Sequence, residues 1–166
     1  MAKTEVFSGA GTTPLTRFPG YLLAQTSRML RHLMDDSLRD LGLTTPQFAA
    51  LACIGESEGC TGAEMARIHH LTPQTMNTIL HNLEAAGFIH REHHPQHGTL
   101  LQISLTDEGR DRLDQAMERV EETHKHLVAL LDESERTTLV QLLERCMLSM
   151  EAGGNVSRGM SCADHL

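Results

Sequence analysis

Two helix-start signals lie eleven residues apart near the middle of the chain, and they restrict its fold more than any other feature. Thr61 and Glu64 have the T-x-x-E spacing of a capping box, in which the two side chains bind free backbone N–H groups. Thr72 and Pro73 mark the second start, because threonine caps helices and proline fits the first helical position. The first helix must therefore be short and end in a tight turn, whereas the second continues to a terminating glycine, Gly87.

The hydrophobic pattern changes from helical to alternating after Gly87. The segment FIHREH is extended in character, and LLQISL alternates, with Leu101, Ile103 and Leu105 on one side. The intervening HPQHGT contains proline and glycine, which indicates a hairpin with a polar tip. Together these elements predict a mainly α fold with a small β-hairpin wing, a winged helix-turn-helix.

The second helix of such a unit enters the DNA major groove, so its exposed face is the first candidate site. Glutamine and asparagine can bind adenine through two hydrogen bonds, and a threonine methyl can contact thymine. The face predicted to be exposed consists of Gln74, Thr75, Asn77, Thr78, His81 and Asn82. An ordinary solvated helix face is the alternative explanation.

Three further residues are candidates for phosphate contacts. Arg91, at the base of the wing, can pair with a phosphate or form a salt bridge with Glu84 or Glu92. Thr61 and Thr72 lie at helix N-termini, where N–H groups favour phosphate, although plain capping needs no DNA.

Amphipathic helices flank the winged unit, at 18–41, 107–131 and 133–151; Gly42 is expected to end the first, and Thr45 to cap the helix after it. A winged unit needs only about 60–70 residues, so the outer apolar stripes lie partly beyond its core, and a second copy would bury them. The predicted organisation is a disordered N-terminus (1–13), an N-terminal dimerisation helix (14–43), a winged helix-turn-helix DNA-binding region (44–106), C-terminal dimerisation helices (107–151) and a disordered tail (152–166).

Composition excludes several classes of protein. The net charge of −8 disfavours a general nucleic-acid coat, and scarce aromatics (no Trp, one Tyr, four Phe) disfavour base-stacking single-strand binding. There is no apolar run that could span a membrane and no signal region, so a cytoplasmic protein is expected. No phosphate loop, H-E-x-x-H or nucleophile elbow is present, so no enzyme is predicted.

These motifs resemble the multiple-antibiotic-resistance regulator family, MarR, over roughly residues 18–150. The chain carries LGLTTPQFAAL, then TGAEMARIHHLTPQTMNTILHNLEAAGFIHR, then HPQHGTLLQISLTDEGRDRL. Leu83–Gly87 match the family's leucine-glutamate-x-x-glycine, and Arg91 matches its wing arginine. Leu105–Gly109 match its leucine-threonine-x-x-glycine. The resemblance implies a homodimeric transcriptional regulator of palindromic double-stranded DNA. Such a regulator is usually a repressor whose DNA affinity falls on binding a small phenolic or aromatic ligand or on oxidation.

The resemblance also implies a ligand site where the first, second and long helices meet. A mostly apolar wall with a few polar groups suits a small effector. The residues carried over are Tyr21, Gln25, Met29, His32, Phe48, Leu51 and Met117. Simple core or dimer roles are the alternative for each of them.

The wing departs from the family pattern. An arginine is common at the tip, but the matching positions read His97-Gly98-Thr99, and Thr78 stands where an arginine is frequent. We define residues 44–105 as the reading head; it has two full cations, Arg67 and Arg91, against five glutamates, a net charge of −3 with histidine neutral. It also holds seven of the chain's eleven histidines.

These histidines suggest a hypothesis for how the missing arginine is replaced. Free histidine titrates near pH ~6.5, and a nearby phosphate raises its pKa, so His94 and His97 first would take up protons on binding DNA. A metal ion held by His93, His94 and His97 is a rival account, but the tip has no carboxylate or thiolate, so adventitious zinc or nickel is favoured over a designed site. Solvated histidines without a role are a third account, and neither a cofactor nor a metal site is predicted.

Two alternatives to a ligand-responsive repressor stay open. The low basic content fits a winged-helix protein-interaction module with weak or no DNA binding. Four cysteines without paired ligand spacing read as free thiols, and Cys60, just before the helix at Thr61, fits a redox-responsive regulator.

Overall fold

A computed structural model describes residues 14–57, 60–94 and 97–152. The predicted disordered ends, 1–13 and 152–166, lie outside these ranges except for Ala152, the last residue of a helix. The elements in chain order are η1 (Pro14–Arg17), α1 (Pro19–Leu38), η2 (Arg39–Leu41), α2 (Thr45–Glu56), α3 (Gly62–Ile68), α4 (Pro73–Ala85), β1 (Ile89–His94), β2 (His97–Leu105), α5 (Asp107–Leu127) and α6 (Glu133–Ala152).

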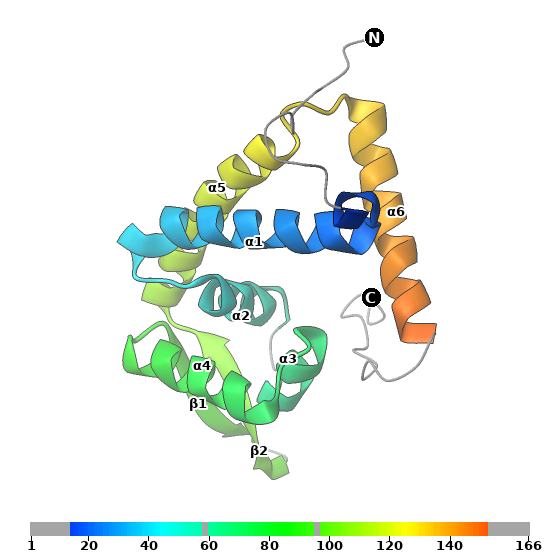
Figure 1. Cartoon of the computed structure of the whole chain (residues 1–166). Coiled ribbons are helices and arrows are strands. Elements are labelled where there is room, and N and C mark those ends of the chain that lie inside the picture. Colours follow the sequence, from blue (N-terminus) through cyan, green and yellow to red (C-terminus); the bar gives the residue numbers. More distant parts are fainter. Residues whose placement is uncertain (1–13, 58–59, 95–96, 153–166) are drawn as a thin grey trace.

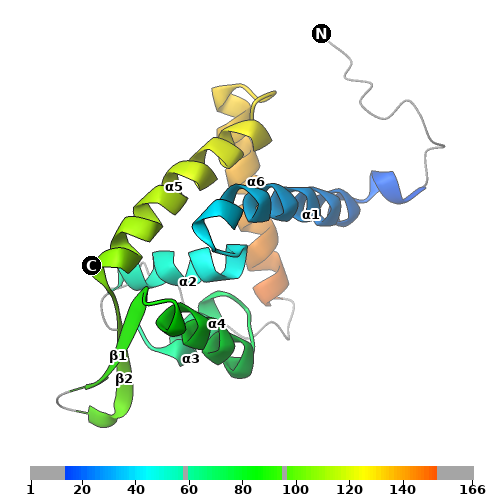
Figure 2. The same ribbon diagram turned by 90° about the vertical axis from the view of Figure 1, so that its left-hand side faces the viewer.

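The reading head lies at one end of the molecule. Helices α2, α3 and α4 group together there, and the β1–β2 hairpin projects beyond them (Figure 1). Helix α5 leads away from the base of the hairpin, α1 crosses α5 next to α2, and α6 runs back along the other side (Figures 1 and 2). The mainly helical fold with a hairpin wing is therefore confirmed.

The core is built from the inner faces of α1, α2, α3, α4 and α5, and α6 adds no buried residue to it. Amphipathic periodicity places apolar residues on one side, and these faces meet. The largest fully buried side chains are Leu38, Leu51, Met65, Met76, Leu80 and Leu83. Because three of these residues belong to α4, the recognition helix is anchored by its inner face and its outer face stays free.

The start of α2 differs from the sequence expectation. Thr44, not Thr45, is the N-cap residue, and Gln47 Oε1 accepts hydrogen bonds from Thr44 N (2.9 Å) and Thr44 Oγ1 (3.0 Å). Thr45 is already helical, and Asp35 Oδ1 of α1 accepts hydrogen bonds from its backbone N (2.9 Å) and its Oγ1 (2.6 Å). The prediction was wrong by one residue because a side chain from another helix binds the second threonine.

The wing base is fixed by close backbone contacts. Gly87 ends α4 with a φ of 78°, a left-handed conformation that favours glycine. Thr106 caps α5, accepts a hydrogen bond from Gly109 N (2.9 Å) and donates its hydroxyl to Gly87 O (2.6 Å). A Cβ on Gly109 would lie 1.8 Å from Phe88 O, so only glycine allows the first turn of α5 to pack against the wing. These contacts give a structural reason for the leucine-threonine-x-x-glycine motif.

Two other boundaries differ from expectation. Helix α5 ends at Leu127 rather than near Leu131, since Asp132 N and Glu135 N bind each other's side chains in a new capping box and the chain must turn before it. Strand β2 begins at His97, so the hairpin tip is shorter than HPQHGT. His94 pairs with His97 after a register irregularity between His93 and His94.

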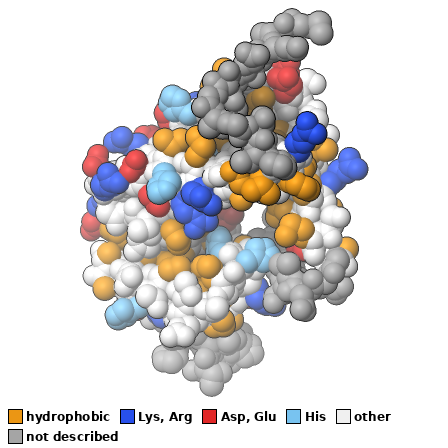
Figure 3. All heavy atoms as spheres, in the orientation of Figure 1, with side chains coloured by type: hydrophobic (Ala, Val, Ile, Leu, Met, Phe, Trp, Pro, Cys, Tyr) orange, Lys and Arg blue, Asp and Glu red, His pale blue; other side chains and the backbone are white. Residues whose placement is uncertain are grey.

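Among the described residues, parts of the outer apolar stripes are left exposed. Within α6, all of whose residues the structure describes, no side chain is buried. Met29 and Leu33 of α1 and Met147 of α6 are 67%, 51% and 59% exposed. Figure 3 shows hydrophobic side chains gathered over α1 and α6 on the visible face. The expectation that the flanking helices carry more apolar surface than the winged core can cover is confirmed.

Candidate nucleic-acid interface

The outer face of α4 is a polar strip set on a rigid base. Thr72 caps the helix by accepting a hydrogen bond from Thr75 N (3.1 Å), and Pro73 occupies the first turn as predicted. Met76, Leu80 and Leu83 are buried on the opposite face. The polar residues predicted to face outward are all exposed: Gln74, Thr75, Asn77, Thr78, His81 and Asn82. They are free to meet base edges in a groove, as direct readout requires.

Helix α3 supports α4 at its start. Thr61 and Glu64 form the predicted capping box: Glu64 Oε2 accepts hydrogen bonds from Thr61 N (2.8 Å) and Thr61 Oγ1 (2.7 Å). These hydrogen bonds hold the pKa of the Glu64 carboxyl below its usual range. A Cβ on Gly62 would lie 3.1 Å from Leu80 Cδ1 and 3.7 Å from Asn77 Oδ1, so the start of α3 directly adjoins α4.

The turn between the two helices is tight. His70 has a φ of 51°, a left-handed conformation that costs free energy for a side chain of its size. Leu71 N donates to Ala66 O (2.8 Å) and closes the turn. His69 is half-buried, and its Nε2 is buried with no hydrogen-bond partner among the described residues. Burial and the neighbouring His70 lower the pKa of His69, so it is held neutral.

Arg91 joins the wing to the recognition helix. Its Nε lies 3.2 Å from Glu84 Oε2, and the side chain of Arg91 is 17% exposed. Its Nε and Nη2 atoms are buried and form no hydrogen bond within the described part of the chain, so the ion pair with Glu84 offsets the burial of this charge. The sequence allowed Arg91 either a phosphate contact or a salt bridge with Glu84 or Glu92. The structure shows the salt bridge with Glu84.

The two wing histidines lie at the outer end of the hairpin. Backbone pairing places His94 opposite His97, far from the base where Ile89 pairs with Leu105. Their side chains lie outside the described residues, so the proton and metal hypotheses stay predictions. No group of three or more His, Cys, Asp or Glu side chains within the described ranges could hold a metal ion.

The residues carried over as a ligand site fall into two groups. Phe48 and Leu51 are buried in the core, which gives them a packing role. Tyr21 and Gln25 are half-buried on α1, and Gln25 Nε2 donates to Tyr21 Oη (2.9 Å). The remaining three, Met29, His32 and Met117, are exposed. Within the described residues of one chain, these groups do not enclose a small molecule.

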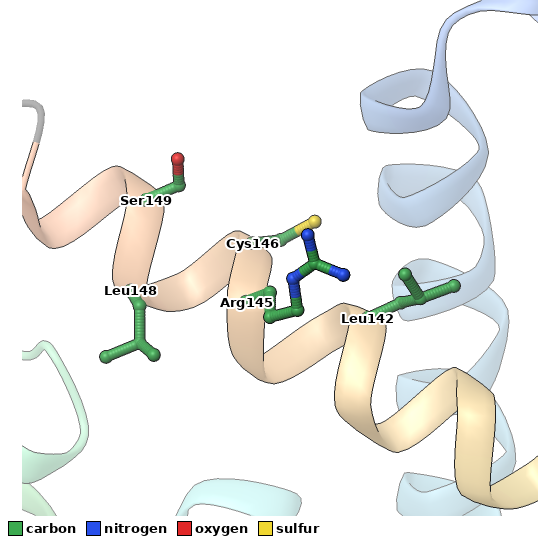
Figure 4. Close-up of a pocket in the computed structure, with 5 residues that line it drawn as sticks. All are labelled: Leu142, Arg145, Cys146, Leu148 and Ser149. Carbon is green, nitrogen blue, oxygen red and sulfur yellow. The ribbon is translucent and has the colours of Figure 1, made fainter.

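A surface hollow on α6 includes none of the residues carried over as a ligand site. It has a volume of about 540 Å³ and is lined by Leu142, Arg145, Cys146, Leu148 and Ser149. Figure 4 shows Leu142 and Cys146 projecting from the side of α6 that faces α1. Because every lining residue comes from one helix, this hollow is part of the uncovered face.

Sequence reasoning missed two contacts. Asp35 of α1 binds Thr45 at the start of α2, and Cys53 Sγ lies 3.8 Å from Cys60 Sγ beside the start of α3. The spacing of ten residues between Asp35 and Thr45 gives no periodic signal. The cysteines are seven residues apart across a helix end, which no metal or redox motif matches.

A helix-turn-helix with an exposed polar recognition helix and a hairpin wing defines a class of DNA-reading proteins. A family model described as the MarR family matches residues 43–97. The HTH-type transcriptional repressor Rv2887 of Mycobacterium tuberculosis is 35% identical over 126 residues, covering 76% of this chain and 91% of that protein. The chain belongs to the MarR family.

Solved structures agree with this assignment. The crystal structure of M. tuberculosis Rv2887 in complex with DNA superposes with a TM-score of 0.65 at 32% identity, covering 78% of this chain and 97% of that chain. The same protein in complex with salicylic acid superposes with a TM-score of 0.64 at 34% identity, covering 78% of this chain and 96% of that chain. Within the part of the chain described here, no helix is both long and apolar enough to cross a membrane.

Proposed function

We propose that this protein is a homodimeric, cytoplasmic transcriptional repressor that binds palindromic duplex DNA and releases it when a small aromatic ligand binds. The arrangement of α4 carries the proposal. Its inner face is buried in the core, whereas Gln74, Asn77 and His81 are exposed in one strip. A family of transcriptional regulators is no enzyme class, and no catalytic role is proposed for these residues.

The relatives support both halves of the proposal. Rv2887 has been solved with DNA and, separately, with salicylic acid. By analogy, the effector of this chain is a small aromatic acid or phenol bound where α1, α2 and α5 meet, with Tyr21 and Gln25 as polar contacts. Since Met29 and Met117 are exposed in one chain, the site is completed by the dimer partner.

Dimerisation follows from the uncovered apolar faces. Among the described residues, fifteen large hydrophobic side chains are more than a third exposed, and they lie mainly on α1, α5 and α6. Large contiguous apolar surfaces on a single chain mark association sites. A twofold dimer would set two α4 helices about one turn of B-DNA apart, roughly 10 base pairs between half-sites.

Binding-site selection from random duplex DNA with the purified full chain tests this function. We expect an enriched palindrome with half-sites about 10 base pairs apart and A/T-leaning contacts. Salicylate should lower the affinity for the enriched DNA, measured by fluorescence anisotropy at fixed ionic strength. Failure to enrich any sequence would instead support a protein-interaction module, which the net charge of −3 on residues 44–105 also fits.

A further inference from the structure

A pair of thiols sits at the joint between α2 and α3. Cys53 lies near the end of α2, and Cys60 immediately precedes Thr61, the residue that caps α3. Their Sγ atoms are 3.8 Å apart, and each residue is 8% exposed. The two cysteines belong to the core that carries the reading head.

The pair is suited to oxidation rather than to metal binding. Zinc takes four ligands, and within the described ranges no third His, Cys, Asp or Glu joins the two sulfurs in a metal-holding group. A disulfide needs the two sulfurs at about 2.05 Å, so sulfurs that now lie 3.8 Å apart must move closer by about 1.8 Å. Backbone hydrogen bonds join both residues to Ser57, from Ser57 N to Cys53 O (3.2 Å) and from Cys60 N to Ser57 O (3.3 Å). The movement falls on Cys60, because Cys53 lies within α2 whereas Cys60 lies between α2 and α3.

We propose that Cys53 and Cys60 form a reversible intramolecular disulfide when the protein meets a hydroperoxide, and that closing the bond shifts the start of α3 against α4. One thiol sulfur attacks a peroxide oxygen, the O–O bond breaks, and a sulfenic acid and water form. The second sulfur attacks the sulfenic sulfur, the S–S bond forms, the S–O bond breaks, and a second water leaves with the remaining thiol proton. The two sulfurs lose two electrons in total, and hydrogen peroxide accepts them.

The position of Cys60 connects this bond to DNA reading. Cys60 is followed by Thr61 and then by Gly62, where an added Cβ would lie 3.1 Å from Leu80 Cδ1 and 3.7 Å from Asn77 Oδ1 of α4. A shift of Cys60 toward Cys53 therefore acts on the capping box of α3 and on the packing under the proposed base reader Asn77. Loss of DNA affinity on oxidation rests on the proposed function, whereas the disulfide and the shift of α3 do not.

Both cysteines are nearly enclosed, which restricts the oxidant. A small hydroperoxide can reach the sulfur of a residue that is 8% exposed more readily than a bulky disulfide can. The disulfide would close a short loop. Because the stabilisation that a disulfide gives grows with loop length, this bond should be weak enough for a dithiol reductant to reopen it.

The experiment uses the full chain with Cys146→Ala and Cys162→Ala, which leaves the proposed pair as the remaining thiols. After hydrogen peroxide and a catalase quench, we expect two free thiols per chain to fall to none and mass spectrometry to find Cys53 linked to Cys60. Hydrogen exchange should increase in α3 after oxidation. Affinity for the selected duplex should fall about tenfold, and dithiothreitol should reverse all three changes.

Matched variants separate the outcomes. Cys53→Ala and Cys60→Ala in the same background should keep their DNA affinity after peroxide. Thermal unfolding checks that each variant is folded, and Cys60→Ser replaces Cys60→Ala if the alanine destabilises the fold. Persisting thiols, a bond between chains, or unchanged exchange in α3 would overturn the proposal. A reduced protein that binds no selected DNA contradicts the proposed function, while thiol mapping and exchange still decide the disulfide and the shift of α3.

Discussion

Arg91 Nε of the wing lies 3.2 Å from Glu84 Oε2 of the recognition helix. This contact fixes the angle between the hairpin and α4, and both partners come from segments that the proposed function places on DNA. A cation paired with a carboxylate contributes less to phosphate binding than a free one. The ion pair therefore makes Arg91 a positioning residue for the wing.

The first prediction concerns Arg91→Ala. We expect a loss of about 1–2 kcal/mol in unfolding free energy, because a half-buried ion pair is removed and Glu84 loses its partner. DNA affinity should fall, but the slope of log affinity against log salt should stay unchanged, since no phosphate contact is lost. A slope smaller by about one would show that Arg91 binds a phosphate after all.

The second prediction concerns base reading by Asn77. Asn77→Ala should cost about 1–3 kcal/mol on the selected DNA and relax specificity at one base position, because an asparagine amide distinguishes adenine through two hydrogen bonds. Gln115→Ala, at an exposed amide on α5 outside the reading head, is the control and should leave both affinities unchanged. Equal losses of Asn77→Ala on specific and random DNA would mean that Asn77 reads no base.

The third prediction concerns the Asp35–Thr45 contact. Hydrogen bonds from the Thr45 hydroxyl and backbone N–H hold the pKa of Asp35 below its ordinary value. The contact therefore stabilises the fold above the ordinary carboxyl pKa of about 3.9, and this stability is lost as pH falls through the lowered pKa. Asp35→Asn should lower the unfolding free energy at pH 7 by about 1 kcal/mol.

Urea unfolding between pH 7 and pH 3 measures this effect. The Asp35→Asn variant should lose less stability on acidification than the wild type, because its side chain does not titrate. Asp40→Asn, at an exposed position in η2, is the control and should leave the acid limb unchanged. Parallel acid limbs for Asp35→Asn and the wild type would refute the role of the contact.

Local sequence signals predicted most of the reading head correctly. The correct features each depend on residues within about four positions of one another, and such interactions survive in any compatible tertiary fold. They are the Thr61–Glu64 capping box, the Thr72 cap, the Gly87 terminator and the polar face of α4. Binary patterning likewise placed Met76 and Leu80 in the core.

The contacts that the sequence did not predict join residues from different elements. Thr44 and Thr45 are both competent caps, and the contact with Asp35 of α1 decides which one becomes helical. Arg91 had Glu84 and Glu92 as possible partners, and strand alternation turns it toward α4. The Cys53–Cys60 pair depends on how the chain bends after α2, which no periodicity specifies.

The fourth prediction concerns the uncovered face of α6. Met147→Glu places a charge on an apolar side chain that is 59% exposed in one chain, so it should dissociate the dimer without unfolding the reading head. Sedimentation velocity should show a shift to monomer, and circular dichroism should keep its helical signal. Gln141→Glu adds the same charge at an exposed polar position and should remain dimeric. A dimer of unchanged affinity in Met147→Glu would place the interface elsewhere.

The last prediction concerns the wing histidines. The reading head carries a net charge of −3, so phosphate should repel it unless histidines become charged. Burial lowers the pKa of His69, which removes it as a source of that charge, whereas His81 and His90 are exposed. We therefore expect DNA affinity to rise as pH falls from 8 to 6, by up to about tenfold per pH unit for each linked proton.

The measurement is a titration of selected duplex at pH 6 and pH 8, at fixed ionic strength and with a chelator present. The double variant His94→Gln, His97→Gln should lose most of the pH dependence, while His124→Gln on α5 should keep it. His69 adds a stability control: its lowered pKa means that folded protein resists protonation, so stability declines as pH falls below about 6.5 and must be checked at pH 6. Equal affinity at both pH values would refute proton uptake, and binding abolished by the chelator would instead identify a metal ion on the wing.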